Sequence, residues 1–278
     1  MTFSNSVRLG ASLGMVFFLI SCTTYTQTTS GKAYLERYES QAQAAGAGAM
    51  DADIREAADV EPILTFPARV GIARIDGGRL TPVPQAEAEA WLAMAGDLGP
   101  GWGEFLPVSP LIAALARQPL SKAEREGYGC GPYGPCIEQT VRDIRLAAAR
   151  QHVDVVLIYE TLSKSERTTN PLAITWLTLI GFYIAPSESI EAEGIAQAVL
   201  LDVRNGYTYG YASTTVEDAA ATLSTMINSS NAAEEVVDKA KLAAALALTK
   251  EVGKMARDLR LELAEKRAAQ AKVQKGPN

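Results

Sequence analysis

The three cysteines and the single histidine are the side chains of this sequence with the clearest chemical potential. Cys22 closes an apolar run, whereas Cys130 and Cys136 stand in a turn-rich segment at 127–136. A thiol can form a disulfide, bind a metal, act as a nucleophile or carry a lipid, and its spacing and neighbours decide between these. The cysteines therefore need separate interpretations.

Cys130 and Cys136 are predicted to form a disulfide. The five residues between them include two Gly and two Pro, which can bend the chain enough to bring the two Cα atoms within bonding range. A metal site would need further ligands, and His152 lies beyond an intervening predicted helix. Because the spacing is not Cys-x-x-Cys, a redox role has little support. The sequence therefore favours a structural disulfide and no metal.

Cys22 ends an apolar segment that begins at Leu9 and follows one basic residue, Arg8. The LISC sequence at 19–22, with small residues before the cysteine, resembles the bacterial lipobox, in which the thiol is acylated and the chain is cut before it. About a dozen apolar residues are too few for a transmembrane anchor, which needs roughly 20. A secretory signal cleaved elsewhere is the other alternative. The resemblance implies a signal peptide at 1–21 and a mature chain that begins at lipidated Cys22.

Acylation of Cys22 would place the folded chain outside the cytoplasm. Several acyl chains, such as palmitate, would hold it firmly, because each buried methylene contributes about 0.8 kcal/mol and one chain alone is marginal. Thr23 follows the cysteine, where lipoproteins retained in the inner membrane often carry Asp. The resemblance therefore implies the periplasmic face of the outer membrane.

The composition gives no support for nucleic-acid binding. Without Arg8, the mature chain has 25 basic and 32 acidic residues, a net charge of −7, so it lacks a basic footprint. The sequence has no Gly-x-Ser-x-Gly elbow, no phosphate-binding Gly loop with Lys and no His-Glu-x-x-His helix. We therefore expect neither an enzyme nor a cofactor.

Two groups of polar residues are candidates for catalysis. His152 falls between a predicted helix and a buried strand, where a lone histidine is usually a helix-end residue. Glu188, Glu191 and Glu193 flank a predicted strand, and a glycosidase-like carboxylate pair is one interpretation. Acidic residues before a strand are more often a solvated edge. We therefore expect no catalytic residues.

Two groups of aromatic residues are candidates for partner binding. One lies in the apolar segment 172–184, which is either a core strand or a surface that contacts lipid or a partner. The other alternates in the segment that follows Asn205-Gly206 and is either a recognition stripe or a half-buried strand face. The candidates are Trp176, Phe182, Tyr183, Tyr207, Tyr209 and Tyr211.

The elements that must position these residues can be read from apolar periodicity and turn signals. Asn205-Gly206 between two alternating segments is the strongest hairpin signal. The expected strands are 67–75, 104–108, 153–159, 193–204 and 207–215, and the expected helices are 84–98, 111–117, 137–151, 216–226 and 232–270. This order predicts an α/β fold, an α+β sandwich whose helices cover one face of a mixed sheet.

The sequence divides into four parts. Residues 1–21 form the signal peptide, and 22–60, rich in Thr, Ser, Gln, Ala and Gly, are predicted to be a flexible tether with a short helix near 31–45. Residues 61–227 are predicted to be the periplasmic α/β domain. The long C-terminal helix and tail occupy 228–278, either solvated or docked onto another subunit.

Several segments together resemble a known family. They are RVGIA at 69–73, DIR at 143–145, VDVVLIY at 153–159, TLIGFY at 178–183 and LDVRNGY at 201–207. In this combination the chain resembles the rhombotarget lipoproteins over roughly 66–225. More distantly, it is similar to the α/β domain of the curli secretion-channel lipoprotein and of the lipoprotein activator of penicillin-binding proteins. No catalytic residues transfer from these families, and the loop at 127–136 and the C-terminal helix depart from them.

The leading hypothesis is a non-enzymatic, lipid-anchored binding or assembly accessory protein of the bacterial envelope, which meets the membrane through its lipid and another envelope protein through its domain. The alternative is an oligomeric, pore-forming or secretion-related outer-membrane lipoprotein. Residues 195–204 and 207–215 are long enough for transmembrane strands, but Asp202 and Arg204 interrupt any lipid-facing band.

Overall fold

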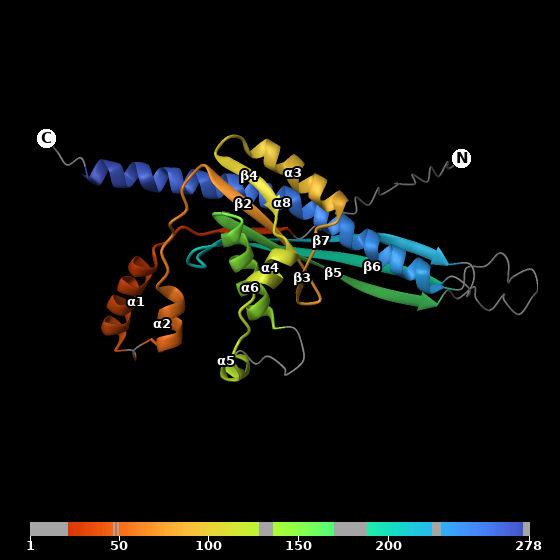
Figure 1. The fold of residues 1–278 in the computed structure, drawn as a ribbon, viewed down its shortest axis with the longest axis horizontal. Coiled ribbons are helices and arrows are strands. Elements are labelled where there is room, and N and C mark those ends of the chain that lie inside the picture. Colours follow the sequence, from red (N-terminus) through yellow and green to blue (C-terminus); the bar gives the residue numbers. More distant parts are fainter. Residues whose placement is uncertain are drawn as a thin grey trace, which may run out of the picture.

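The computed structural model describes residues 22–46, 48, 50–127, 136–169, 188–223 and 229–274. A mixed seven-stranded sheet has the strand order β1-β7-β6-β5-β2-β3, with β4 also paired to β2 (Figure 1). The strands are β1 (Thr23–Thr26), β2 (Ala68–Asp76), β3 (Arg79–Thr81), β4 (Trp102–Pro107), β5 (Val155–Thr169), β6 (Glu188–Asp202) and β7 (Thr208–Leu223). The helices are α1 (Gly31–Ala45), α2 (Ala52–Ala58), α3 (Gln85–Leu98), α4 (Pro110–Ala116), α5 (Lys122–Gly127), α6 (Ile137–Arg150) and α8 (Ser229–Gln274).

The turn and cap signals lie where the sequence predicts them. Gly206 has a φ of 78° between β6 and β7, a left-handed conformation that glycine adopts without steric cost. The Ser109 hydroxyl accepts a hydrogen bond from the Ile112 N–H, and Pro110 occupies the first position of α4. The predicted mixed sheet, hairpin and long C-terminal helix are therefore confirmed.

Helices cover both faces of the sheet, so the prediction of one covered face is wrong. Helices α3 and α8 pack on one face, and α4 and α6 pack on the other (Figure 1). Strand β5 shows why. Leu157 faces α3 and α8, whereas Val156 and Ile158 face α4 and α6, and all three are buried. A strand that is apolar on both faces needs cover on both.

The segment after Cys22 differs from the predicted flexible tether. Strand β1 pairs antiparallel with β7, from Thr23 opposite Ser213 to Thr26 opposite Gly210. Helices α1 and α2 then occupy most of 31–58. Composition suggested a tether, but the β-branched and aromatic residues at 23–26 suit an edge strand, and β7 supplies its hydrogen-bond partners.

The predicted helix at 216–226 is also wrong, because β7 continues to Leu223. Its alanines favour a helix locally, yet the chain pairs with β6 from Thr208 opposite Leu201 to Leu223 opposite Glu188. Tertiary pairing overrides weak local propensity in such segments.

Helix α8 is part of the main core rather than a solvated appendage. Its buried face recurs at helical spacing and packs against the sheet and α3. The buried residues on this face include Ala244, Leu248, Val252, Met255, Leu259 and Leu263. Among the described helices, none is long and apolar enough to cross a membrane.

Candidate functional site

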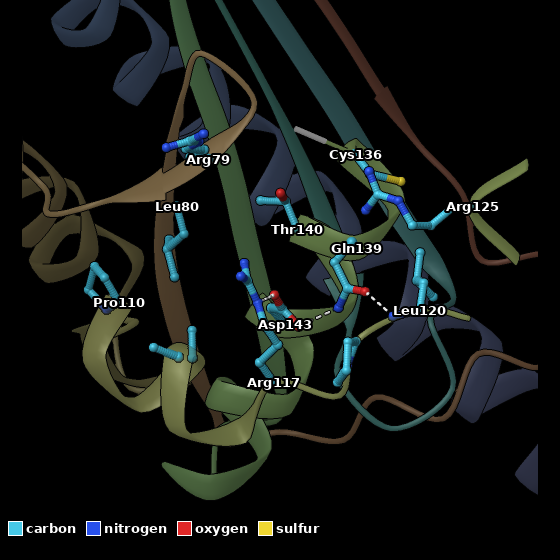
Figure 2. Close-up of a pocket in the computed structure, with 13 residues that line it drawn as sticks. Arg79, Leu80, Pro110, Arg117, Leu120, Arg125, Cys136, Gln139, Thr140 and Asp143 are labelled. Atoms are coloured by element: carbon cyan, nitrogen blue, oxygen red, sulfur yellow. Dashed lines mark hydrogen bonds and ion pairs between the residues drawn. The ribbon is translucent and has the colours of Figure 1, made fainter. Parts of the chain in front are cut away.

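A hollow formed by described residues lies on the α4 and α6 side of the sheet (Figure 2). It has a volume of about 630 Å³ and is bordered by β3, α4, α5, α6 and the segment between α4 and α5. We call it the arginine cleft. Its lining residues are Arg79, Leu80, Pro110, Ala113, Ala114, Arg117, Pro119, Leu120, Arg125, Cys136, Gln139, Thr140 and Asp143.

A buried carboxylate forms the floor of the arginine cleft. Asp143 is 4% exposed, and its Oδ2 accepts a 2.8 Å hydrogen bond from Arg117 Nε while its Oδ1 accepts one of 2.7 Å from Gln139 Nε2. The side-chain oxygen of Gln139, Oε1, accepts a 3.0 Å hydrogen bond from the Leu120 N–H (Figure 2). Because Gln139 and Asp143 are four residues apart on α6, they lie on one face of this helix. Together they fix the segment between α4 and α5 to that face.

The entrance carries positive charge. Arg79 is exposed, and its guanidinium makes no hydrogen bond or ion pair within the described part of the chain. Arg117 is paired with Asp143, but its side chain remains 60% exposed. A guanidinium presents several donors in a plane, which suits a carboxylate or phosphate. The cleft can therefore accept an acidic group of a ligand or partner.

The polar groups inside the cleft are engaged in structural contacts. The Thr140 hydroxyl donates a 2.7 Å hydrogen bond to the Gly78 carbonyl, which ties α6 to the β2–β3 turn. Cys136 is buried just before α6. Among the described residues the only free cysteine is Cys22, and no cluster of His, Cys, Asp and Glu could hold a metal ion. Cys130 lies outside the described residues, so its disulfide with Cys136 stays a prediction.

The three tyrosines after the hairpin turn do not form one exposed stripe. Tyr207 and Tyr209 are buried in the α8 layer, with ring centroids 4.9 Å apart. A bulge shifts the β6–β7 register between Leu200 and Leu201, so that Tyr211 lies opposite Val199 on the other face. The prediction of a shared strand face is therefore wrong for Tyr211, and burial removes the first two tyrosines from partner binding.

The buried tyrosines are hydrogen-bonded. Tyr207 donates to the Thr29 carbonyl at 2.8 Å. Tyr209 donates to the buried Asp202 carboxylate at 3.1 Å and accepts from the Leu64 N–H at 2.7 Å. Burial raises the pKa of Tyr207 to about 12, and burial with the Asp202 charge raises the pKa of Tyr209. Burial and the nearby Glu87 raise the pKa of Tyr159 in the same layer.

These raised pKa values predict alkaline unfolding. The folded state favours neutral phenols, so their contribution to stability is complete below about pH 10, the ordinary tyrosine pKa. That of Tyr207 is lost as the pH rises towards about 12. We expect urea midpoints to fall across this range and Tyr207→Phe to flatten the fall, whereas Tyr34→Phe on the exposed side of α1 should not. Equal slopes in all three proteins would contradict this.

The histidine and the glutamates that the sequence offers as candidates for catalysis are not among the lining residues of the arginine cleft. His152 is exposed with a φ of 55°, and its N–H donates to the Ala149 carbonyl at the end of α6, which makes it the expected helix-end residue. Glu193 lies opposite Lys164 of β5. Glu188 and Glu191 belong to β6, but their side chains are outside the described ones. Trp176, Phe182 and Tyr183 lie outside the described residues, so their role stays a prediction.

Apart from Cys136, the residues of the arginine cleft were missed by sequence reasoning. Arg79 and Arg117 belong to different elements, and neither has a motif around it. The i, i+4 spacing of Gln139 and Asp143 on a strongly amphipathic helix was the available signal, because both fall on the half that faces the protein.

No protein-family model and no curated protein matches the chain. Among solved structures, a PelC dodecamer variant from Paraburkholderia phytofirmans is similar at 14% identity and a TM-score of 0.27, covering 65% of this chain and 91% of that one. PelC itself, also a dodecamer from Paraburkholderia phytofirmans, is similar at 13% identity and a TM-score of 0.25, covering 66% of this chain and 91% of that one. The hypothetical protein CT253 from Chlamydia trachomatis is similar at 10% identity and a TM-score of 0.27, covering 68% of this chain and 97% of that one. These similarities are distant and establish no family.

Proposed function

We propose that this chain is a lipid-anchored, non-enzymatic protein on the periplasmic face of the bacterial outer membrane, and that it binds an acidic group of another envelope component. The lipobox-like sequence that ends at Cys22 supports the anchor. The arginine cleft carries the binding role, because Arg79 and Arg117 stand at the entrance of a hollow of about 630 Å³, and Asp143, the one carboxylate among its described lining residues, is already paired.

The chemistry of the cleft supports binding rather than catalysis. Asp143 accepts from both Arg117 and Gln139, and the Thr140 hydroxyl is bonded to Gly78. A hydroxyl needs a base within hydrogen-bond reach to act as a nucleophile, and the printed partner of the Thr140 hydroxyl among the described residues is a backbone carbonyl. An arginine at the entrance gains most from a partner that brings a negative charge.

Site-specific photo-crosslinking in intact cells tests this proposal. A crosslinker at the exposed lining residue Ala114 should give a defined adduct, whereas one at Glu89, exposed on α3, should not. Arg79→Glu should reduce the adduct about tenfold, which corresponds to about 1.4 kcal/mol, and Arg79→Lys should preserve it. Equal adducts from both positions, or none from Ala114, would contradict a binding cleft.

The alternative, an oligomeric pore, has one observation in its favour. Strands β5, β6 and β7 contain 15, 15 and 16 residues, more than the 9–11 that a transmembrane strand needs. However, α8 covers one face of β6, and Lys164 lies opposite Glu193 further along the β5–β6 pair. Lipid-facing strands need an apolar outer face. Light scattering with and without mild detergent decides: a detergent-dependent ring would favour the pore, and a monomer in both would favour binding.

A further inference from the structure

We propose that residues 22–30, which we call the strap, clamp the lipidated cysteine to the sheet, so that the domain lies directly on the lipid bilayer with β1 and the adjoining edge of β7 toward the headgroups. This inference rests on the proposed lipid anchor. It adds an orientation that the anchor alone does not imply, because a flexible tether would leave the domain free to turn.

The strap is hydrogen-bonded along its backbone to β7. Thr23 to Thr26 form the antiparallel ladder, and the Gln27 N–H continues it by donating to the Tyr209 carbonyl at 2.9 Å. The Gln27 side-chain amide donates to the Thr208 carbonyl at 2.9 Å. At the other end, Cys22 Sγ lies 3.4 Å from Thr214 Oγ1. The atom that would carry lipid is therefore held beside the middle of β7.

Side chains from α8 and from Tyr207, just before β7, also bind the strap. Thr26 Oγ1 donates to Glu262 at 2.6 Å, and Lys266 Nζ donates to the Thr28 carbonyl at 2.6 Å. Thr28 is 5% exposed, and Tyr207 donates to the Thr29 carbonyl at 2.8 Å. Nine residues released from these contacts could extend about 30 Å. When the strap is bound to the domain, almost none of this length separates the lipid from the domain.

The edge beside Cys22 has properties that suit the headgroup region. Tyr25 is 56% exposed, and tyrosine concentrates where hydrocarbon meets water. Within the described strands, β7 has no partner on this edge from Thr214 to Leu223. Its backbone donors and acceptors need water or polar headgroups, not hydrocarbon. The chain has a net negative charge, so the proposed orientation rests on the strap and not on attraction to anionic lipids.

Energy transfer to labelled headgroups tests this orientation in the lipidated, full-length chain. A clickable donor dye is placed at Glu217, exposed on β7 beyond Cys22, or at Ala123, exposed on α5, which lies away from β7 (Figure 1). The protein is reconstituted in phosphatidylethanolamine and phosphatidylglycerol vesicles with headgroup acceptors. We expect several-fold stronger transfer from Glu217 than from Ala123.

A spacer variant provides the matched control. Twelve Gly/Ser residues inserted between Cys22 and Thr23 should remove the difference between the two sites, whereas the same insert at the exposed Gly48 should leave it unchanged. Equal transfer in a membrane-bound, acylated protein would overturn the orientation only. Absence of acylation at Cys22 by mass spectrometry would overturn the anchor and the orientation together. Transfer between Glu217 dyes, with none to lipid, would assign this edge to a second copy and also overturn the orientation.

Discussion

Replacement of Cys22 by Ala is expected to move the protein from the membrane fraction to the soluble fraction of the periplasm. The variant is expressed with an ordinary secretory signal peptide, so that export is preserved while acylation is lost. With about 0.8 kcal/mol for each buried methylene, several acyl chains exceed any attraction that this acidic surface can supply. Fractionation followed by intact-mass measurement of the mature chain provides the readout.

The fold should survive this substitution, which keeps the result interpretable. The Cys22 side chain is exposed, and its one described contact, to Thr214, is replaceable by water. Thr23→Ser in the native sequence is the matched control and should remain acylated and membrane-bound. A Cys22→Ala protein that still sediments with membranes would mean that a protein surface, and not lipid, holds it there.

The strongest local signals in the sequence predicted most of the described sheet and helices. The positive φ of Gly206 helps to determine the β6–β7 turn, and the Ser109-Pro110 pair determines the start of α4. The continuous apolar stretch of β5 indicated a covered strand. In each case the deciding interaction lies within a few residues of chain.

The errors arose where distant residues decide. Strand β1 is four residues long, and its partner β7 is far along the chain, since Thr23 pairs with Ser213, 190 residues later. The bulge that separates Tyr209 from Tyr211 depends on pairing with β6. Arg79 on β3 and Asp143 on α6 line the same arginine cleft, and no periodicity within either element reveals that they share it. Such features depend on the assembled sheet.

Gly194→Ala is expected to be the most destabilising methyl-sized change in the sheet. Strand β6 presents the small buried residues Ala192, Gly194 and Ala196 beneath α8. A Cβ at Gly194 would overlap the carbonyl oxygen of Ala240, which is helix backbone and cannot turn aside as a side chain would. Helix α8 or the strand must therefore shift, and overpacking of this kind costs typically about 1–3 kcal/mol.

The matched control is Gly96→Ala on α3, where an added Cβ meets nothing within 4 Å. Removing a glycine from a helix interior should stabilise the protein by about 0.5–1 kcal/mol. Urea unfolding of the oxidised mature chain carrying Cys22→Ala should therefore shift the two midpoints in opposite directions with unchanged slopes. Because the two substitutions add the same methyl group, opposite shifts of the two midpoints would show that the surroundings of that group decide its effect. A neutral Gly194→Ala would mean that α8 lies further from β6. It would then also contradict the contacts that Glu262 and Lys266 of α8 make with the strap.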